Sequence, residues 1–558
     1  MKSKKKTDRL KPIRCILALP FLAALILVGC RSDAPVIFSI HPAIGVMGEP
    51  MTILGSFFGD ERDSSYVTIG GAQPTGTAYM EWYDNRIRLR VPDFGEAGLV
   101  FVHVGGRRSN GVLFANQATM PRAVDDGRPG LGPMVTSVSP QAGAVGSVVT
   151  ITGSGFGGSR GSGGVFFSRN SGTVAGMRPW SEEWEHIQVS DAEFGYELWS
   201  DREIRVRIPS GATSGNMEVR TARGRSSPLF FEINGSPGTK DFVDRRSFMI
   251  SYSVNIRTGN AETPNTLHLW VPTPAASVAH QNAELLFSNP EPFIQDYFGT
   301  SLYRLDNLEA HGSTDINLSW MVEVYGIRTS VQSQAIRREA VSPIRNAHTR
   351  SCPRLPSDDP RIRNLATSIL AGENNPYLQA RRIYDWMLNI AWEDRVQGDI
   401  FQAIEARRAD PFIGTLLYAT LLRAAGIPTQ PVAGVLVGRN NQTMNHYWVE
   451  FWLDGLGWIP VDPAMGAGAI PEAFAHPGGA AFEDAPGNPA DFYFGNIDNR
   501  RIVFSRGFTD LSQMDPRGRT VTHVRSFALQ SPWEEAVGGI EAYSSLWGNI
   551  IITGMHAQ

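Results

Sequence analysis

The feature that most constrains the fold of this chain is an internal repeat in its first half. The segment SIHPAIGVMGEPMTILGSFFG reappears as SVSPQAGAVGSVVTITGSGFG, with matched residues 98 positions apart (150 − 52 = 98). Further along, the spacing grows to 117 (199 − 82 = 117), so the second copy has gained 19 residues (117 − 98 = 19). A fixed spacing over many matches predicts two units of the same fold. The matched pairs are Pro42/Pro140, Gly45/Gly143, Gly48/Gly146, Thr52/Thr150, Ile53/Ile151, Gly55/Gly153, Phe58/Phe156, Gly59/Gly157, Trp82/Trp199, Asp84/Asp201, Ile87/Ile204 and Pro92/Pro209.

Each copy has the pattern of short strands separated by glycine turns. Val100, Val102 and Val104 alternate with other residues, as in a half-buried strand, and another strand ends at Gly70-Gly71. Several such strands predict an all-β sandwich of seven strands. The two repeated phrases resemble the IPT/TIG family of immunoglobulin-like domains, over 35–116 and 133–235. This resemblance implies a spacer or binding module without chemistry of its own.

The insertion in the second copy carries an aromatic cluster. Trp180 and Trp184 lie within it, and Tyr196 and Trp199 follow. Such rings could bind a glycan or a protein partner. We favour the simpler interpretation, in which they cover a small core of the insertion itself.

From Pro360 the apolar period changes from two residues to about 3.6, which predicts helices. One begins after Asn374, a plausible N-cap. The helix in FIGTLLYATLLRAAGIP is apolar nearly all round and should be buried, with Gly426 as its stop. Strands follow in PVAGVLVG, HYWVEFWLDG and GWIPVDP. The helix periodicity is carried by Ile362, Leu365, Ala366, Ile369, Ala380, Ile383, Tyr384, Met387, Ile390, Leu416, Leu417, Thr420, Leu421 and Ala424.

The phrases LLRAAGIPTQPVAG, HYWVEFWLDGLGWIPVDPA and FYFGNIDNRRIVFSRG resemble the transglutaminase-like superfamily, over about 355–510. Strand-like phrases such as LHLWVPTP resemble the β-rich leader of bacterial members. The resemblance implies a cysteine opening the buried helix, a histidine beginning the next strand and an aspartate beginning the one after. His446 takes the histidine place and Asp462 the aspartate place. The cysteine place, fifteen residues before the glycine of GIP (426 − 15 = 411), is filled by Pro411.

Pro411 suits the fold while removing the nucleophile. Proline is favourable at the first position of a helix, and Asp410 before it is a good N-cap. Two substitute nucleophiles remain open. Thr415 lies one turn further along the helix, and Cys352 lies in a proline-rich stretch before the first core helix. Neither is favoured, because a hydroxyl starts from a far higher pKa than a thiol, and Cys352 would need an unusual path to His446.

The other residues of this region have structural interpretations. His446 and Asp462 can persist as a satisfied polar pair in an inactive domain. Trp392, Trp448 and Trp458 are expected in the core or in a pocket wall. The segment 471–490 is rich in Gly, Ala and Pro and reads as a surface loop, which could leave the cleft open or plug it.

The first thirty residues predict export. A positive stretch precedes an apolar run from Ile16 to Val28, which is short for a membrane-spanning helix. The ending Leu-Val-Gly-Cys resembles the lipobox of bacterial lipoproteins, which implies that Cys30 is lipidated and becomes the mature N-terminus. Cys15 would leave with the signal. Cys352 would then be the one thiol left, and no internal disulfide could form.

The sequence therefore predicts a multidomain exported protein, anchored to a bacterial membrane by Cys30, on the periplasmic side or the cell surface. The net charge of −4 predicts no nucleic-acid binding, and we expect no metal and no cofactor. The leading hypothesis is a catalytically inactive transglutaminase-like domain that binds a peptide, a protein or the cell wall. The alternatives are an active thiol hydrolase or acyltransferase using Cys352, and a structural spacer. The expected regions are a signal peptide at 1–29, two all-β immunoglobulin-like sandwiches at 35–116 and 133–235, a β-rich leader at 236–350, an α+β transglutaminase-like core at 355–510 and a C-terminal β extension at 511–558.

Overall fold

The computed structural model describes residues 34–557 except 43, 46, 93–96, 117–131, 162, 170–185, 276–279, 296, 337, 339–341, 470, 472–473 and 475–486. The predicted signal peptide and Cys30 lie outside the described residues, as do Trp180 and Trp184 of the insertion and most of the 471–490 segment. Among the helices that are described, none has the length and apolar character needed to cross a membrane.

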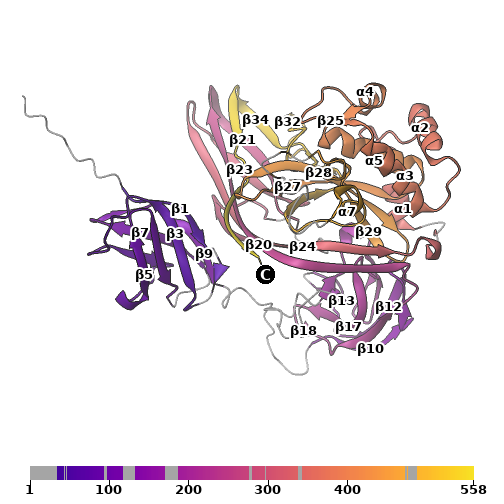
Figure 1. The fold of residues 1–558 in the computed structure, drawn as a ribbon, viewed down its shortest axis with the longest axis horizontal. Coiled ribbons are helices and arrows are strands. Elements are labelled where there is room, and N and C mark those ends of the chain that lie inside the picture. Colours follow the sequence, from indigo (N-terminus) through magenta and orange to yellow (C-terminus); the bar gives the residue numbers. More distant parts are fainter. Residues whose placement is uncertain are drawn as a thin grey trace, which may run out of the picture.

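The first repeat forms a two-sheet sandwich at one end of the molecule (Figure 1). Its core is made by inward-facing residues of both sheets, including Ile53, Val100 and the Trp82 ring. One sheet has the order β1 (Val36–His41), β3 (Pro50–Ser56), β6 (Arg86–Arg90), β5 (Tyr79–Tyr83); the other has β2 (Ile44–Gly45), β9 (Val112–Asn116), β7 (Ala97–Val104), β4 (Tyr66–Ile69), with β8 (Arg107–Arg108) beside β7.

The second repeat has the same architecture. Tyr196 and Trp199, expected to cover the insertion, belong to the core of the sandwich itself. The Tyr196 hydroxyl accepts from Val165 N (3.0 Å), and the Trp199 indole donates to Phe156 O (3.2 Å). The first repeat makes the same two bonds at the matched residues. Its sheets are β10 (Met134–Ser139), β12 (Val148–Ser154), β16 (Glu203–Arg207), β15 (Tyr196–Trp199), and β11 (Ala142–Gly143), β19 (Leu229–Ile233), β17 (Ala212–Thr221), β13 (Gly164–Arg169), β14 (His186–Gln188), with β18 (Gly224–Arg225) beside β17.

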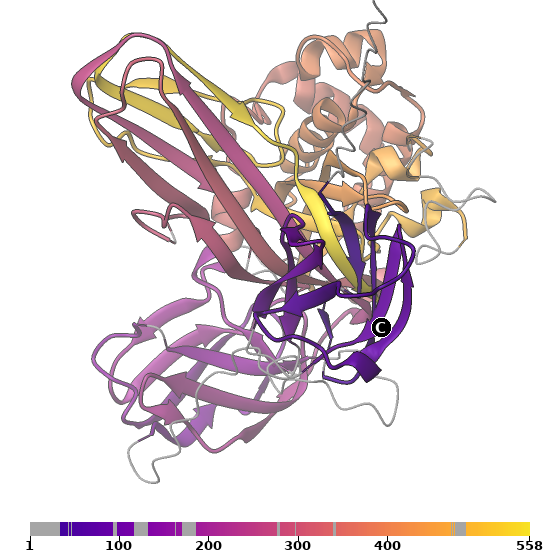
Figure 2. The ribbon, with the colours of Figure 1, turned by 90° about the vertical axis from the view of Figure 1, so that its left-hand side faces the viewer.

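A third β unit combines two segments that are distant in the sequence. The strands after residue 236 pair with strands from the C-terminal end of the chain, so each sheet contains both (Figure 2, where magenta and yellow strands lie side by side). The leader and the C-terminal extension therefore share one core. The sheets are β22 (Gln281–Asn289), β24 (Ser313–Val331), β20 (Gly238–Thr258), β35 (Tyr543–Trp547), with β36 (Ile551–Ala557) also on β20, and β23 (Thr300–Asp306), β21 (Ala261–Pro272), β34 (Glu534–Ile540), β32 (Arg519–Val521).

The α+β core packs helices on a four-stranded antiparallel sheet. Helix α5 (Pro411–Ala424) is buried along most of its length, as its apolar sequence predicts, and Gly426 after it has φ = +72°. Helix α3 (Pro376–Leu388) is capped by Asn375 and not by the expected Asn374, because the side chain of Asn375 accepts from the N–H groups of the first turn. The sheet order is β29 (Gly457–Val461), β28 (Thr443–Leu453), β27 (Thr429–Val437), β30 (Arg501–Arg506); the other elements are α1 (Pro343–His348), α2 (Pro360–Leu370), α4 (Ile400–Ala406), α6 (Pro463–Gly466), α7 (Pro489–Phe492), β25 (Ala391–Trp392) and β26 (Arg408–Ala409).

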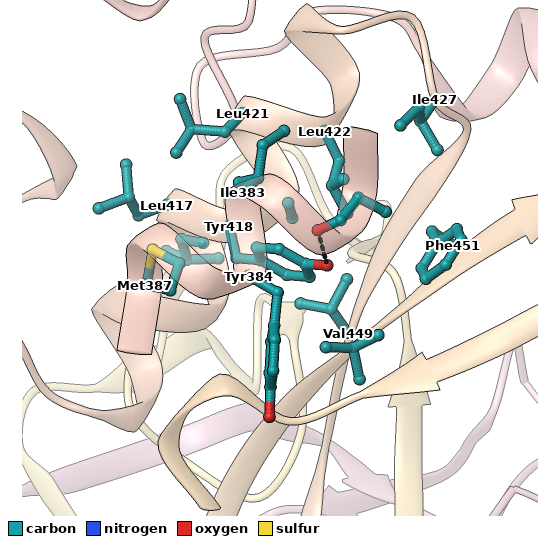
Figure 3. Close-up of a cluster of buried hydrophobic side chains, with 14 of the residues drawn as sticks. Ile383, Tyr384, Met387, Leu417, Tyr418, Leu421, Leu422, Ile427, Val449 and Phe451 are labelled. Atoms are coloured by element: carbon teal, nitrogen blue, oxygen red, sulfur yellow. Dashed lines mark hydrogen bonds between the residues drawn. The ribbon is translucent and has the colours of Figure 1, made fainter. Parts of the chain in front are cut away.

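The centre of this core is an aromatic and aliphatic cluster between α3, α5 and β28 (Figure 3). Tyr418 lies within it and donates its hydroxyl to Ala380 O (3.0 Å), so the phenol is satisfied inside an apolar environment. Tyr384 packs beside it, with ring centroids 6.4 Å apart. The cluster fixes α5 against the sheet and so positions the start of the helix.

The second repeat is joined to the α+β core by a partly buried ionic link. Arg506 on β30 lies 2.7 Å from Glu193 of the repeat and 2.7 Å from Glu450 on β28. Trp452 and Trp458 of the core sheet pack in the hydrophobic core of the repeat. Shared apolar burial and a doubly paired arginine hold the two domains in one arrangement.

Candidate functional site

The start of α5 has the local structure that its sequence predicts. Asp410 is the N-cap and accepts from Ile413 N (2.8 Å), and Pro411 occupies the first helical position. Asp410 also accepts from Val396 N (2.8 Å) and forms an ion pair with Arg525. Arg525 stacks on Phe412 as well, 5.2 Å from the ring centroid. The helix start is therefore held by charge and covered by a residue from the C-terminal segment.

The predicted His–Asp pair is present and buried. Nε2 of His446 lies 2.6 Å from Oδ2 of Asp462, and the side chains are 2% and 0% exposed. Asp462 also caps α6, because its Oδ1 accepts from Met465 N (3.0 Å). Because an ionised carboxylate can only accept hydrogen bonds, the His446 ring donates to Asp462 through Nε2. The second ring nitrogen, Nδ1, does not take part in this bond.

An arginine that the sequence analysis did not single out completes this site. Arg501, the first residue of β30, lies 2.6 Å from the same Oδ2 of Asp462 through Nη1. Its Nε lies 3.0 Å from Asp498, which also accepts from the Tyr493 hydroxyl (3.0 Å). The sequence NIDNRRIVFSRG could have indicated this ion pair, because Asp498 and Arg501 lie three residues apart at the start of an apolar strand.

The electrostatics of Asp462 follow from these contacts. Burial alone would raise the pKa of its carboxyl, but His446 and Arg501 outweigh burial and lower the pKa to about 2. The same carboxylates hold the pKa of Arg501 above its usual range despite burial. Asp462, Asp498 and Arg501 therefore form a charged network in which every carboxylate has a cationic or hydroxyl donor.

Four polar atoms around Asp462 are buried and have no hydrogen-bond partner among the described residues. They belong to two donors with fixed hydrogens, the indole of Trp448 and the Nη2 of Arg501, and to His446 Nδ1 and the Tyr384 hydroxyl. Trp448 lies near two of these groups. The centroid of its ring is 6.2 Å from that of the His446 ring and 5.3 Å from the guanidinium carbon of Arg501. In the part of the chain that is described, no thiol or hydroxyl is hydrogen-bonded to His446 Nδ1.

The helix start and the histidine strand meet through the residues next to Pro411 and His446. Phe412 and Tyr447 have ring centroids 5.0 Å apart in an edge-to-face contact. The Tyr447 hydroxyl donates to Ser526 O (2.9 Å), next to Arg525. The C-terminal segment therefore lies over the contact between α5 and β28.

Cys352 lies away from this contact. Its backbone pairs with that of Leu355. Its side chain is near Arg423: burial lowers the pKa of the Arg423 guanidinium, and Cys352 opposes that change. Arg423 is in the last turn of α5, and Pro411 is in the first. Arg423 lies twelve positions after Pro411 (423 − 411 = 12), or about 18 Å along the helix axis. Thr415 is buried within α5, and its hydroxyl is not hydrogen-bonded to His446, whose Nδ1 has no hydrogen-bond partner among the described residues.

Trp392 and Trp448 have different surroundings. Trp392 lies on β25, which pairs with β26 just before α5, and its indole donates to Met387 O (3.2 Å). Its ring rests on Gly414, where a Cβ would come within 2.5 Å of it. Trp448 is fully buried beside His446. No group of three or more His, Cys, Asp or Glu residues is placed to hold a metal within the described ranges.

Comparison with known families agrees with this architecture. Residues 363–463 match the transglutaminase-like superfamily, and residues 35–117 and 133–233 match the IPT/TIG domain. The chain carries two IPT/TIG domains followed by a domain that belongs to the transglutaminase-like superfamily. The predicted resemblances to the IPT/TIG family and to the transglutaminase-like superfamily, and the fold class, are thus confirmed. A comparison with curated proteins gave no match.

Solved structures of low similarity cover different parts of the chain. A Cytophaga hutchinsonii protein provisionally assigned as a cysteine protease is 15% identical, covers 57% of this chain and 91% of its own, and has a TM-score of 0.36. SGBP-B from a xyloglucan utilization locus of Bacteroides uniformis is 11% identical over 54% of this chain and 100% of its own (TM-score 0.13). SGBP-B of Bacteroides ovatus, in complex with a mixed-linkage heptasaccharide, is 12% identical over 51% and 72% (TM-score 0.12).

Proposed function

We propose that this protein is a lipid-anchored component of a bacterial cell envelope whose transglutaminase-like domain binds a peptide, a protein or a cell-wall stem without cleaving it. The observation that carries the proposal is residue 411. The superfamily resemblance puts the nucleophile there, and the side chain is a proline at the first position of α5. A proline ring cannot form a thioester.

The loss of the nucleophile removes covalent catalysis. In catalytic triads, removal of the nucleophile lowers turnover by about 10⁶. The one thiol expected in the mature chain is beside Arg423, at the far end of α5. His446 and Asp462 then act as part of the buried network, where Arg501 shares the carboxylate.

Hydrogen-bond donors around Asp462 support a binding role. The Trp448 indole and the Nη2 of Arg501 are buried without partners among the described residues. Buried donors of this kind favour a carbonyl or carboxylate acceptor, because leaving a donor unmatched costs free energy. Peptide carbonyls and the carboxylates of a cell-wall stem both offer such acceptors.

The lipid anchor is the second part of the proposal. A positive stretch, an apolar run and the Leu-Val-Gly-Cys ending support export and acylation of Cys30. The anchor would place both IPT/TIG domains at a membrane surface, on the periplasmic side or outside the cell. Mass spectrometry of the N-terminal peptide purified from membranes tests this part, and an unmodified Cys30 would reject it.

The test of inactivity is an assay of the purified protein for amine incorporation, glutamine deamidation and peptide cleavage. We expect no turnover above background with any substrate. Robust turnover that disappears in His446→Ala would show an active enzyme. Labelling with iodoacetamide near neutral pH tests the relocated-nucleophile alternative, and a hyper-reactive Cys352 would support that alternative.

Binding is tested with a stem peptide of the cell wall, using calorimetry and a matched pair of variants. Trp448→Phe keeps the ring and removes the indole donor beside His446. Trp458→Phe removes a buried indole donor that lies in the core of the second repeat. We expect weaker binding only in Trp448→Phe. Equal affinities for both variants and the parent would contradict the site.

One observation favours a structural spacer as the second candidate. His446 is only 2% exposed, and Phe474 packs with Met465, whose N–H donates to Asp462. A spacer predicts no saturable binding of any peptide or cell-wall fragment. It also predicts that Trp448→Phe changes stability alone.

A further inference from the structure

The outer face of the sheet β1-β3-β6-β5 in the first domain carries an unusual set of exposed side chains. Phe38 is 68% exposed at a bulge of β1, and Phe57 is 44% exposed just after β3. Tyr83 at the end of β5 is 50% exposed. We call this set the β1 patch; it comprises Val36, Phe38, Leu54, Phe57 and Tyr83.

The strand register brings the patch together at one end of the sheet. Leu54 pairs with Ser39, next to the Phe38 bulge, and with Arg86 on its other side. Arg86 pairs in turn with Tyr83, and its guanidinium lies 5.4 Å from that ring. Directly paired residues share a face, so these side chains form a continuous row.

The second domain provides an internal comparison, because it has the same fold but keeps only one of the five apolar side chains of this patch, Met134 at the position of Val36 (57% exposed). The positions matching Phe38, Leu54 and Phe57 at a spacing of 98 are Thr136, Thr152 and Gly155. At a spacing of 117, Tyr83 is replaced by Ser200. The fold therefore does not require the aromatic residues, and their exposure needs another explanation.

Phe57 strengthens this point through its backbone. It has φ = +62°, while the matching Gly155 has φ = +75°. A side chain with a Cβ is disfavoured in this region, and glycine is the usual choice. The first domain thus keeps a phenylalanine at a position where glycine would fit better, with the ring turned to solvent.

The position of the patch along the chain identifies its occupant. Five residues, 31–35, separate Cys30 from β1, so Cys30 lies within about 20 Å of Val36 even when the chain is fully extended. The patch includes Val36, which is the first residue of β1 and pairs with Ser56 at the end of β3. A short tether gives an effective concentration near the millimolar range, so weak apolar contacts suffice.

We propose that the β1 patch inserts into the interfacial region of the membrane and orients the first domain on it. This inference rests on acylation of Cys30, as in the proposed function. The contact is apolar and aromatic, as at other membrane interfaces. Charge does not drive it, because Arg86 is already 3.2 Å from Glu81 and Asp84 lies beside Tyr83.

The test is hydroxyl-radical footprinting of the acylated full chain on phospholipid vesicles. The reference is the chain from residue 30 onward with Cys30→Ser, free in solution. We expect labelling of Phe38 and Phe57 to fall about fivefold on vesicles. Phe230 of the second domain, 66% exposed, should label equally in both states. Protection should persist in about 1 M salt, where the Debye length is about 3 Å.

A variant built from the second domain supplies the control. The triple variant Phe38→Thr, Leu54→Thr, Phe57→Gly uses residues that the same fold already accepts. In the acylated variant, Tyr83 should label at its solution rate, while in the acylated parent it should be protected. Circular dichroism and the unchanged labelling of Phe230 verify folding.

Three results would overturn the inference. Equal labelling of Phe38 and Phe57 on and off vesicles, with the lipid on Cys30 verified by mass, rejects the inference and leaves the anchor intact. Protection that appears only with an added envelope protein assigns the patch to a protein partner. An unmodified Cys30 rejects the anchor itself and this inference with it.

Discussion

Arg501 Nη1 lies 2.6 Å from Oδ2 of Asp462, the same oxygen that His446 Nε2 contacts at 2.6 Å. In a catalytic triad, the carboxylate orients the histidine and stabilises the imidazolium that forms. Here a permanent cation shares that carboxylate. The arrangement therefore serves as a buried ionic network that holds β28, α6 and β30 together.

The first prediction concerns the stability that this network provides. Arg501→Met would leave Asp462 and Asp498 buried without their cation. We expect the free energy of unfolding to fall by about 3–5 kcal/mol, as for other broken buried pairs. Arg361→Met is the matched control: the Arg361 side chain is 62% exposed, so the free energy of unfolding should stay close to that of the parent. Similar losses in urea unfolding of the two variants would contradict the assignment.

The second prediction is an acid-dependent loss of stability from Asp462. In the folded state its pKa is lowered to about 2 from the ordinary aspartate value of 3.8. A lowered carboxyl pKa contributes stability above the unfolded pKa, which is lost as the pH falls through the folded pKa. The parent should lose about 2 kcal/mol from this group between pH 4 and pH 2. Asp462→Asn should lack this component in unfolding curves measured across that range, and an unchanged pH profile would count against it.

The third prediction addresses the link between the second IPT/TIG domain and the α+β core. Arg506 joins Glu193 to Glu450, so Arg506→Met should leave Glu450 buried without its arginine, with the neutral Gln430 amide still donating to it. We expect a loss of about 3–5 kcal/mol. We also expect faster amide exchange both in the turn Asp191–Glu193 and in β28, because the contact spans two domains. Glu193→Gln, which keeps a hydrogen-bond acceptor, should show a smaller effect; exchange changes confined to one domain would argue against coupling.

The fourth prediction is that Pro411→Cys restores the thiol and not the enzyme. A reactive thiolate needs a neighbouring imidazolium, and Asp462 is already paired with Arg501. Arg525 also covers the helix start through Asp410 and Phe412. We expect a folded variant with no acyl-enzyme in mass spectra after incubation with a glutamine donor. Pro411→Ala controls for the loss of proline, and turnover in Pro411→Cys alone would contradict this reasoning.

Much of the architecture followed from patterns along the chain. The repeat spacing predicted two sandwiches, and apolar periodicity predicted the buried helix that starts at Pro411. The sequence also predicted the N-cap at Asp410, because a side-chain hydrogen-bond acceptor directly before a proline is typical of a helix start. The neighbouring Asn374 and Asn375 could not be separated in this way, since either offers the same amide one residue apart.

The sequence by itself determined the order of the domains and the helix start without a thiol, and it predicted His446 and Asp462 as a pair, which the structure brings into contact. Only the tertiary structure decided that Arg501 shares Asp462, that Cys352 lies at the other end of α5, and that the leader and C-terminal strands form common sheets. The physical reason is the distance along the chain over which each interaction acts. Caps, periodicity and repeats act between residues close in the chain, whereas buried ion pairs and sheet pairing join segments whose separation in sequence carries no pattern of its own.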